Sequence, residues 1–192
     1  MATDIVPEKL SLVGKDNADY LISLFRSIPG FPKEGINFRD YMPLLADAKG
    51  LGILLDALVK ALPVDPSEFD TVAGLEARGF LIGVPLAARL GKGFVAVRKA
   101  GKLPPPVVHA EYSLEYGTAA IEIEKDVISP KERVLIVDDL IATGGTAHAA
   151  QQLIESVGGI VSGFSFIMLL KGLNGCDLLK DAPISTLVSM PA

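Results

Sequence analysis

Residues 134–150, VLIVDDLIATGGTAHAA, limit the possible folds more than any other part of this sequence. The run VLIV is apolar at four consecutive positions, as in a strand that is covered on both faces. Two acids and a short loop with two glycines follow, and a helical pattern then covers residues 145–157. A buried strand joined to a helix in this way is typical of a parallel sheet with helices packed against it.

The same alternation of β-rich runs and helical stretches extends from residue 71 to residue 169. We predict strands at 71–75, 93–98, 134–139 and 160–169, and helices at 80–90 and 145–157. Upstream, apolar spacing predicts a helix over 21–28 and another over 49–62, with an ordered loop at 31–43 between them. The sequence therefore predicts one α/β domain over residues 1–192, with a mostly parallel central sheet and helices on both faces. Residues 1–45 would form its N-terminal part.

Composition excludes several classes of protein. The net charge of −5 argues against a general nucleic-acid binder, which needs a basic face. A single cysteine, Cys176, excludes an intrachain disulfide and a Cys-rich zinc site. The N-terminus lacks an apolar signal region, and the most apolar stretch, 164–170, is far shorter than the ~20 residues that cross a bilayer. We expect a soluble cytoplasmic protein with no membrane or nucleic-acid partner.

The acids and glycines of 134–150 have the chemistry of a sugar-phosphate site. Glycines let backbone N–H groups approach a ligand, threonines add hydroxyl donors, and a helix N-terminus favours negative charge. The carboxylates can accept hydrogen bonds from vicinal hydroxyls, and a phosphate beside a diol is a ribose 5-phosphate. The predicted ligands are Asp138, Asp139, Ala142, Thr143, Gly144, Gly145 and Thr146. Helix capping by the acids and a plain Gly-Gly turn are the structural alternative.

Two basic segments follow predicted strands. GLEARGF places Arg78 in a turn between a strand and a helix, and RKAGKLP supplies Arg98, Lys99 and Lys102. Arginine and lysine in such loops commonly bind phosphates. A solvated basic turn is the alternative for the second segment.

These segments resemble known proteins. Residues 134–150 are similar to the phosphoribosyl pyrophosphate (PRPP) motif of type I phosphoribosyltransferases. FPKEGINFRD, GLEARGF, RKAGKLP, EYSLEYG and VDDLIATGGT also appear in the order found in adenine phosphoribosyltransferases. The resemblance implies the type I fold, transfer of a phosphoribosyl group from PRPP to N9 of adenine, Mg²⁺ bound mainly through PRPP, and a homodimer. It also implies that Arg78, Arg98, Lys99, Lys102 and Tyr116 contact pyrophosphate.

FPKEGINFRD is the implied base site. By resemblance, the backbone of Asn37 pairs with the adenine edge, Phe38 and Leu170 lie on opposite ring faces, and Arg39 hydrogen-bonds a ring nitrogen. A backbone N–H beside a C=O matches adenine, whereas hypoxanthine and guanine have the opposite polarity at these positions. One departure is Leu169, where the family usually has Glu.

Residues 99–117 contain three consecutive prolines and show no clear periodicity, which predicts a flexible lid. By resemblance, EYSLEYG within it is a mobile hood, and Glu115 manages the proton on the purine ring. A solvated loop acid is the alternative for Glu115.

Two other functions are weighed against this one. A phosphoribosyltransferase for another base is disfavoured by FPKEGINFRD. A PRPP-sensing regulator would carry a further DNA-binding domain and a basic face, and only about thirty residues precede the first motif in this acidic chain.

Overall fold

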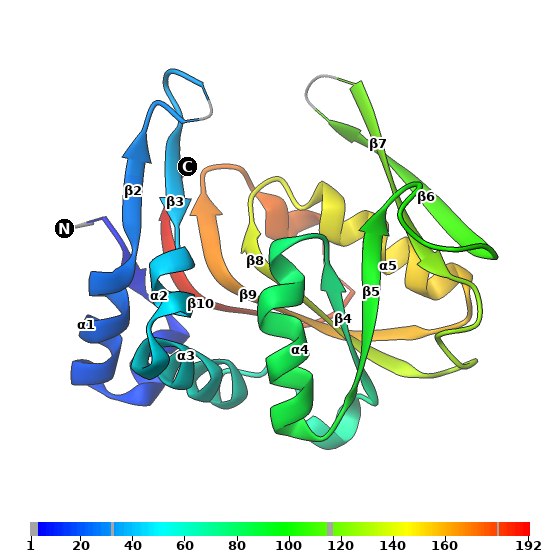
Figure 1. The fold of residues 1–192 in the computed structure, drawn as a ribbon, viewed down its shortest axis with the longest axis horizontal. Coiled ribbons are helices and arrows are strands. Elements are labelled where there is room, and N and C mark those ends of the chain that lie inside the picture. Colours follow the sequence, from blue (N-terminus) through cyan, green and yellow to red (C-terminus); the bar gives the residue numbers. More distant parts are fainter. Residues whose placement is uncertain (1–3, 32, 115–116, 180) are drawn as a thin grey trace.

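An eight-stranded sheet forms the centre of the computed structural model, which describes residues 4–31, 33–114, 117–179 and 181–192. Along the chain its strands are β1 (Val6–Pro7), β4 (Thr71–Leu75), β5 (Gly93–Lys99), β6 (Val107–Leu114), β7 (Gly117–Glu124), β8 (Arg133–Ile141), β9 (Ile160–Lys171) and β10 (Ile184–Pro191). Their order in the sheet is β1-β10-β9-β8-β4-β5-β7-β6 (Figure 1). The five strands from β10 to β5 run parallel, and β1, β7 and β6 are antiparallel additions at the two ends.

Helices cover both faces of this sheet. They are α1 (Lys15–Leu24), α2 (Met42–Ala46), α3 (Ala48–Lys60), α4 (Arg78–Leu90) and α5 (Gly145–Ser156), with short 3-10 helices η1 (Lys9–Val13), η2 (Pro66–Glu68) and η3 (Gly175–Leu178). In β8, Leu135 and Val137 belong to the apolar cluster that contains α3 and α4, whereas Val134 and Ile136 belong to the cluster that contains α5. The apolar run VLIV is therefore covered on both sides, and the predicted architecture is confirmed.

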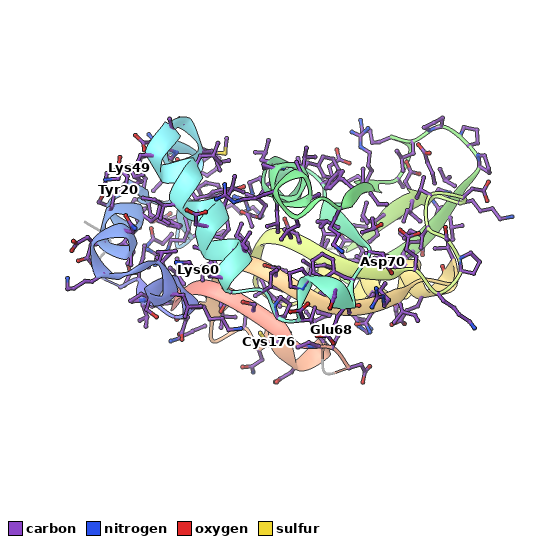
Figure 2. All side chains as sticks on the ribbon, turned by 90° about the horizontal axis from the view of Figure 1, so that it is seen from below. Tyr20, Lys49, Lys60, Glu68, Asp70 and Cys176 are labelled. Atoms are coloured by element: carbon purple, nitrogen blue, oxygen red, sulfur yellow. The ribbon has the colours of Figure 1, made fainter. Side chains whose placement is uncertain are left out.

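The N-terminal helices pack through one apolar cluster that includes Leu21, Leu44 and Leu54, and polar contacts join α3 to α1. Lys49 at the start of α3 lies over the ring of Tyr20 on α1, with Nζ 4.2 Å from the ring centre (Figure 2). The Tyr20 hydroxyl donates to Asp47 Oδ1 at 2.9 Å, and the same oxygen accepts the N–H of Gly50 at 2.6 Å. Asp47 thus caps α3 and ties its first turn to α1. Among the described residues, none of the helices is long and apolar enough to span a membrane.

The predicted helix over 21–28 is wrong at its end. α1 stops at Leu24, and a two-stranded sheet follows, made of β2 (Arg26–Pro29) and β3 (Asn37–Asp40). β3 lies in the segment predicted to be a loop. Arg26 Nε donates to Asp40 Oδ2 at 3.0 Å across this pair, so cross-strand pairing of polar residues wins over the local helical spacing.

The prediction that 99–117 lacks regular structure is also wrong. β6 occupies most of its second half and pairs antiparallel with β7 along its whole length. Val108, Ala110 and Tyr112 pack against the cluster on the α5 side, which is the alternation expected of a half-buried strand. Residues 100–106, which include the three prolines, form turns and bends without a helix or strand.

Two hairpins extend beyond the edge of the sheet at which the central parallel strands end. Figure 1 shows β2–β3 and β6–β7 rising on either side of the carboxyl ends of the central parallel strands. In open α/β sheets this is the edge where ligands bind.

Candidate active site

A pocket of about 260 Å³ lies at the carboxyl ends of β4, β5 and β8. Nine of the residues predicted from the sequence line it, namely Arg78, Lys99, Asp138, Asp139, Ala142, Thr143, Gly144, Gly145 and Thr146. Glu76, Tyr112 and Phe166 are also part of its wall. The structure therefore brings the predicted phosphate loop, the acid pair and two of the predicted cations into one pocket.

The phosphate loop joins β8 to α5 and depends on glycine. Gly144 has a φ of +81°, and a Cβ added there would lie 2.2 Å from the carbonyl oxygen of Gly175. Gly175, at the start of η3, is equally confined, because its Cβ would lie 2.2 Å from the carbonyl oxygen of Ala142. No described side chain caps the first turn of α5. Its N–H groups and partial positive charge can therefore serve an anion in the pocket.

The acid pair is buried at the end of β8. The Asp139 side chain is 4% exposed, and its Oδ2 lies 3.0 Å from Nε of Arg78. Asp138 Oδ1 accepts the N–H of Asp139 at 2.9 Å. Burial raises the pKa of both carboxyls; the charge of Asp139 raises that of Asp138 further, whereas Arg78 opposes the shift at Asp139. Oδ2 of Asp139 has no aligned hydrogen-bond donor among the described residues, so it can accept one from a ligand hydroxyl.

A carboxylate organises the predicted pyrophosphate cations. Glu76 Oε2 accepts the N–H of Lys99 at 2.7 Å, and its Oε1 lies 3.3 Å from Nη2 of Arg98. Burial acts to raise the pKa of Glu76, but these donors outweigh it and hold the pKa below its ordinary value. Nη1 of Arg98 donates to the carbonyl oxygen of Lys102 at 3.0 Å. Lys99 thus lines the pocket, whereas Arg98, which is bonded to Glu76 and to Lys102, and Lys102 itself lie outside the pocket lining.

Phe38 on β3 is connected to this pocket through Arg78. The guanidinium carbon of Arg78 lies 5.5 Å from the centre of the Phe38 ring, and the ring of Phe31 meets Phe38 edge-on at 5.2 Å. Arg78 therefore contacts the predicted base residue on one side and Asp139 on the other. Oδ1 of Asn37 is buried without a hydrogen-bond partner among the described residues.

Arg39 is placed differently from its neighbours. Its side chain is 5% exposed, ion-pairs with Asp4, and donates from Nη1 to the Ser27 hydroxyl at 2.7 Å. It does not line the pocket, so its predicted contact with a ring nitrogen stays a prediction. Leu170, the predicted partner of Phe38, is half-buried near the end of β9 and packs on the α3 and α4 side of the sheet.

The predicted proton-transfer residue Glu115 and its neighbour Tyr116 lie outside the described residues. The strands on either side are β6 and β7, and Tyr112 of β6 lines the pocket. The hairpin that carries the EYSLEYG segment thus forms part of the wall of the site.

Several residues in or beside the site are not predicted from the sequence, among them Glu76, Tyr112 and Phe166 in the pocket wall and Tyr41 behind Arg78. Glu76 and Tyr112 lie inside GLEARGF and EYSLEYG, so their motifs pointed to them. Tyr41 had no such signal. It is fully buried, its hydroxyl donates to the carbonyl oxygen of Arg78 at 3.3 Å, and burial raises its pKa. A neutral phenol therefore fixes the first turn of α4.

The geometry agrees with comparisons to known proteins. The phosphoribosyl transferase domain family matches residues 46–165. The adenine phosphoribosyltransferase of Bifidobacterium longum strain DJO10A is 65% identical over 190 residues, covering 99% of this chain and 98% of that protein. That of Bifidobacterium adolescentis is 63% identical and covers 100% and 99%. The chain belongs to the adenine phosphoribosyltransferase family.

Solved structures of the family have the same fold. The adenine phosphoribosyltransferase of Thermoanaerobacter pseudethanolicus is 48% identical with a TM-score of 0.86, over 90% of this chain and 99% of that one. The Saccharomyces cerevisiae protein, solved with an imino-altritol bisphosphate and adenine, is 42% identical with a TM-score of 0.83, over 90% and 98%. The resemblance and the type I fold predicted from the sequence are confirmed.

The resemblance implies that Leu169 stands where the family usually has Glu. It packs with the apolar cluster on the α5 side, whereas Leu170 packs on the opposite face of β9. Leu169 does not line the pocket, so the substitution leaves the described phosphate and ribose part of the site unaltered.

Proposed function

We propose that this protein transfers the 5-phosphoribosyl group of PRPP to N9 of adenine, giving AMP and pyrophosphate. The observation that carries the proposal is the single pocket that joins the TGGT loop, the acid pair, Arg78 and Lys99. Arg78 in turn contacts Phe38 of the predicted base segment. The close relatives named adenine phosphoribosyltransferase support the choice of base.

PRPP would lie along the carboxyl ends of the strands. The loop 142–146 and the start of α5 would hold the 5-phosphate, because both N–H groups and threonine hydroxyls are available there. Asp138 and Asp139 would accept hydrogen bonds from the ribose hydroxyls. Arg78, Arg98, Lys99, Lys102 and Tyr116 would meet the pyrophosphate. Lys99 already lines the pocket, and Arg98 and Lys102 belong to the same segment.

Adenine would bind between Phe38 and Leu170. Stacking of a base on an aromatic ring contributes ~1–3 kcal/mol. The backbone of Asn37 would pair with N1 and the 6-amino group, and Arg39 would donate to a ring nitrogen. A base with a carbonyl at position 6 would leave both backbone groups unpaired, at ~1–3 kcal/mol each.

The reaction depends on alignment of the base with C1′ of the ribose and on exclusion of water, and it needs no covalent bond to the protein. N9 would attack C1′ of the ribose as the bond to pyrophosphate breaks, through a state with oxocarbenium character. Glu115 would accept or hold the purine proton, and the β6–β7 hairpin would close over the site to exclude water. Preorganised cations would stabilise the charge that develops on the leaving group.

Mg²⁺ fits this pocket as an ion that arrives with PRPP. Among the described residues, no group of three or more His, Cys, Asp or Glu side chains is arranged to hold a metal ion. Mg²⁺ in phosphate sites commonly keeps several waters and few protein ligands, so the oxygens of PRPP would hold it. When bound, it would offset negative charge on the pyrophosphate.

We also propose a homodimer in the cytoplasm. α4 exposes Leu81 at 45% and Val84 at 50%, one turn apart on the same face, and burial of such a pair favours association. Light scattering after size exclusion tests this: a monomeric mass at micromolar concentration contradicts it.

The function is tested by following pyrophosphate release from PRPP and Mg²⁺ with adenine, hypoxanthine, guanine or xanthine. Turnover with adenine, and AMP as the product, is the expected result. Turnover only with another base would leave the PRPP site in place and overturn the base site. PRPP binding without turnover on any base would contradict the enzyme and favour a sensor.

A further inference from the structure

Glu122 on β7 is a buried acid outside the pocket just described. It is 1% exposed and lies between two buried isoleucines, Ile121 and Ile123. A carboxylate in such a place is costly unless donors surround it. Its donors come from the turn that follows β5.

Three consecutive backbone N–H groups converge on this carboxylate. Oε2 accepts from Gly101 at 2.9 Å, and Oε1 accepts from Lys102 at 2.6 Å and Leu103 at 2.7 Å. Nδ1 of His109 on β6 lies 3.4 Å from Oε2. Burial acts to raise the pKa of Glu122, but the three N–H groups and His109 outweigh it and hold the pKa below its ordinary value. Glu122 is therefore ionised at neutral pH.

Successive N–H groups that point into one concavity form a nest that binds anions. Here the anion is part of the protein. Because Glu122 occupies all three N–H groups, the turn 101–103 has none of them left for a phosphate of the substrate. The N–H of Lys99, just before the turn, is likewise bonded to Glu76. Pyrophosphate contacts from residues 99–103 would therefore come from side chains, chiefly those of Lys99 and Lys102.

The segment is held on two sides. Glu76 accepts the N–H of Lys99 at 2.7 Å, and Glu122 holds the turn that begins two residues later. The turn is not fixed by regular secondary structure, since residues 100–106 lie outside helices and strands. Besides the two carboxylates, Arg98 Nη1 donates to the carbonyl oxygen of Lys102 and the N–H of Ala100 donates to the carbonyl oxygen of Ala120, each at 3.0 Å. Of these contacts, only those with Glu122 hold all three N–H groups of the turn.

We propose that Glu122 is a positioning residue for pyrophosphate: it fixes the turn 101–103 beside Lys99 and so places the ammonium group of Lys102 for contact with the leaving group. This inference rests on the proposed function, because that function makes pyrophosphate the leaving group. The three hydrogen bonds from the turn 101–103 to Glu122, called the clamp below, do not depend on that function.

The test is Glu122→Gln, with Glu124→Gln as the matched control. Glutamine keeps the shape but puts an NH₂ group where one oxygen was, so at least one of the three N–H groups faces another donor. Glu124 lies two residues along the same strand and is half-buried, and no described side-chain bond holds it to the turn. Both variants replace a glutamate of β7 by glutamine, but only Glu122→Gln removes an acceptor of the N–H groups of the turn.

Kinetics separate positioning from general damage. We expect Glu122→Gln to raise the KM for PRPP ~10-fold or more, on the scale of losing a hydrogen bond to a charged group, while the KM for adenine at saturating PRPP stays near that of Glu124→Gln. The Tm of Glu122→Gln should fall, because a buried N–H group then faces another donor, so all variants are assayed well below their Tm. Equal KM values for PRPP in wild type and Glu122→Gln would overturn the inference, and so would equal increases for both substrates. Formate added to Glu122→Ala supplies a carboxylate, and it should lower the KM for PRPP in that variant and not in Glu124→Ala.

Hydrogen exchange tests the clamp without any substrate. The amides of Gly101, Lys102 and Leu103 should exchange faster in Glu122→Gln than in wild type or Glu124→Gln. Unchanged exchange overturns the inference. If wild type shows no turnover at all, the proposed function fails, whereas the exchange result still decides whether Glu122 holds the turn.

Discussion

Gly175→Ala should damage PRPP binding, although no substrate group touches this residue in the proposed mode. The added Cβ would lie 2.2 Å from the carbonyl oxygen of Ala142 and 2.8 Å from the N of Gly144, whereas ordinary contacts begin at 3.4 Å. Relief requires the phosphate loop or η3 to move by about 1 Å. A misplacement of ~1 Å in a site can lower activity ~10²-fold, equivalent to ~2.7 kcal/mol in the barrier.

The assay is steady-state kinetics of Gly175→Ala against Gly52→Ala. Gly52 lies in α3, where an added Cβ would meet nothing within 4 Å, so alanine should be neutral or slightly stabilising there. We expect kcat/KM for PRPP to fall ~10²-fold only in Gly175→Ala. A wild-type value in that variant would show that η3 yields instead of the phosphate loop, and would refute the reasoning.

Three further substitutions test other parts of the molecule. Glu115→Gln should lower kcat by ~10²-fold or more, as for a lost general acid or base, with little change in the Kd of PRPP; an unchanged kcat would remove Glu115 from the mechanism. Asp138→Asn should weaken PRPP binding and raise the Tm at pH 7. Burial and the charge of Asp139 raise the pKa of Asp138 well above 3.8, so ionisation above that pH costs folding stability, which the neutral amide avoids; a lower Tm contradicts this. Asp70→Asn should lower stability to urea at pH 7 and by much less at pH 2. Hydrogen bonds from Arg133 hold the pKa of Asp70 at about 2, so the stabilisation is complete above its ordinary pKa of 3.8 and disappears as the pH falls through 2; an equal difference at both pH values argues against the pair.

The phosphate half of the site could be predicted because it is local in sequence. The strand, the acids and the loop of 134–146 follow one another directly, so chain order alone fixes their proximity. The strands predicted at 71–75 and 93–98 match β4 and β5, because each is a short apolar run before or after a helical pattern. The carboxyl ends of parallel strands meet at one edge of the sheet, and this rule predicts that Lys99 and Asp138 line the same pocket.

The remaining features depend on contacts between distant segments. Arg39 is held by Asp4, 35 positions earlier, and no local pattern predicts that pairing. Glu122 alternates with isoleucines, which is the pattern of a solvent-facing strand residue, yet the turn at 101–103 covers it. The three consecutive prolines before β6 obscure its strand pattern in the sequence, although Val108, Ala110 and Tyr112 alternate with more polar neighbours.

The order of strands in the sheet has a consequence for folding. β4 pairs with β5 across 22 positions of the chain, Thr71 with Gly93, but its other neighbour is β8, and Thr71 meets Val134 across 63 positions. Closing so long a loop lowers the entropy of the chain before the stabilising contacts between β4 and β8 have formed. The phosphate loop is the continuation of β8, so it takes up its position only when that late pairing is complete. Recovery of PRPP binding during refolding therefore reports the closure of the sheet, and not the earlier formation of its helices.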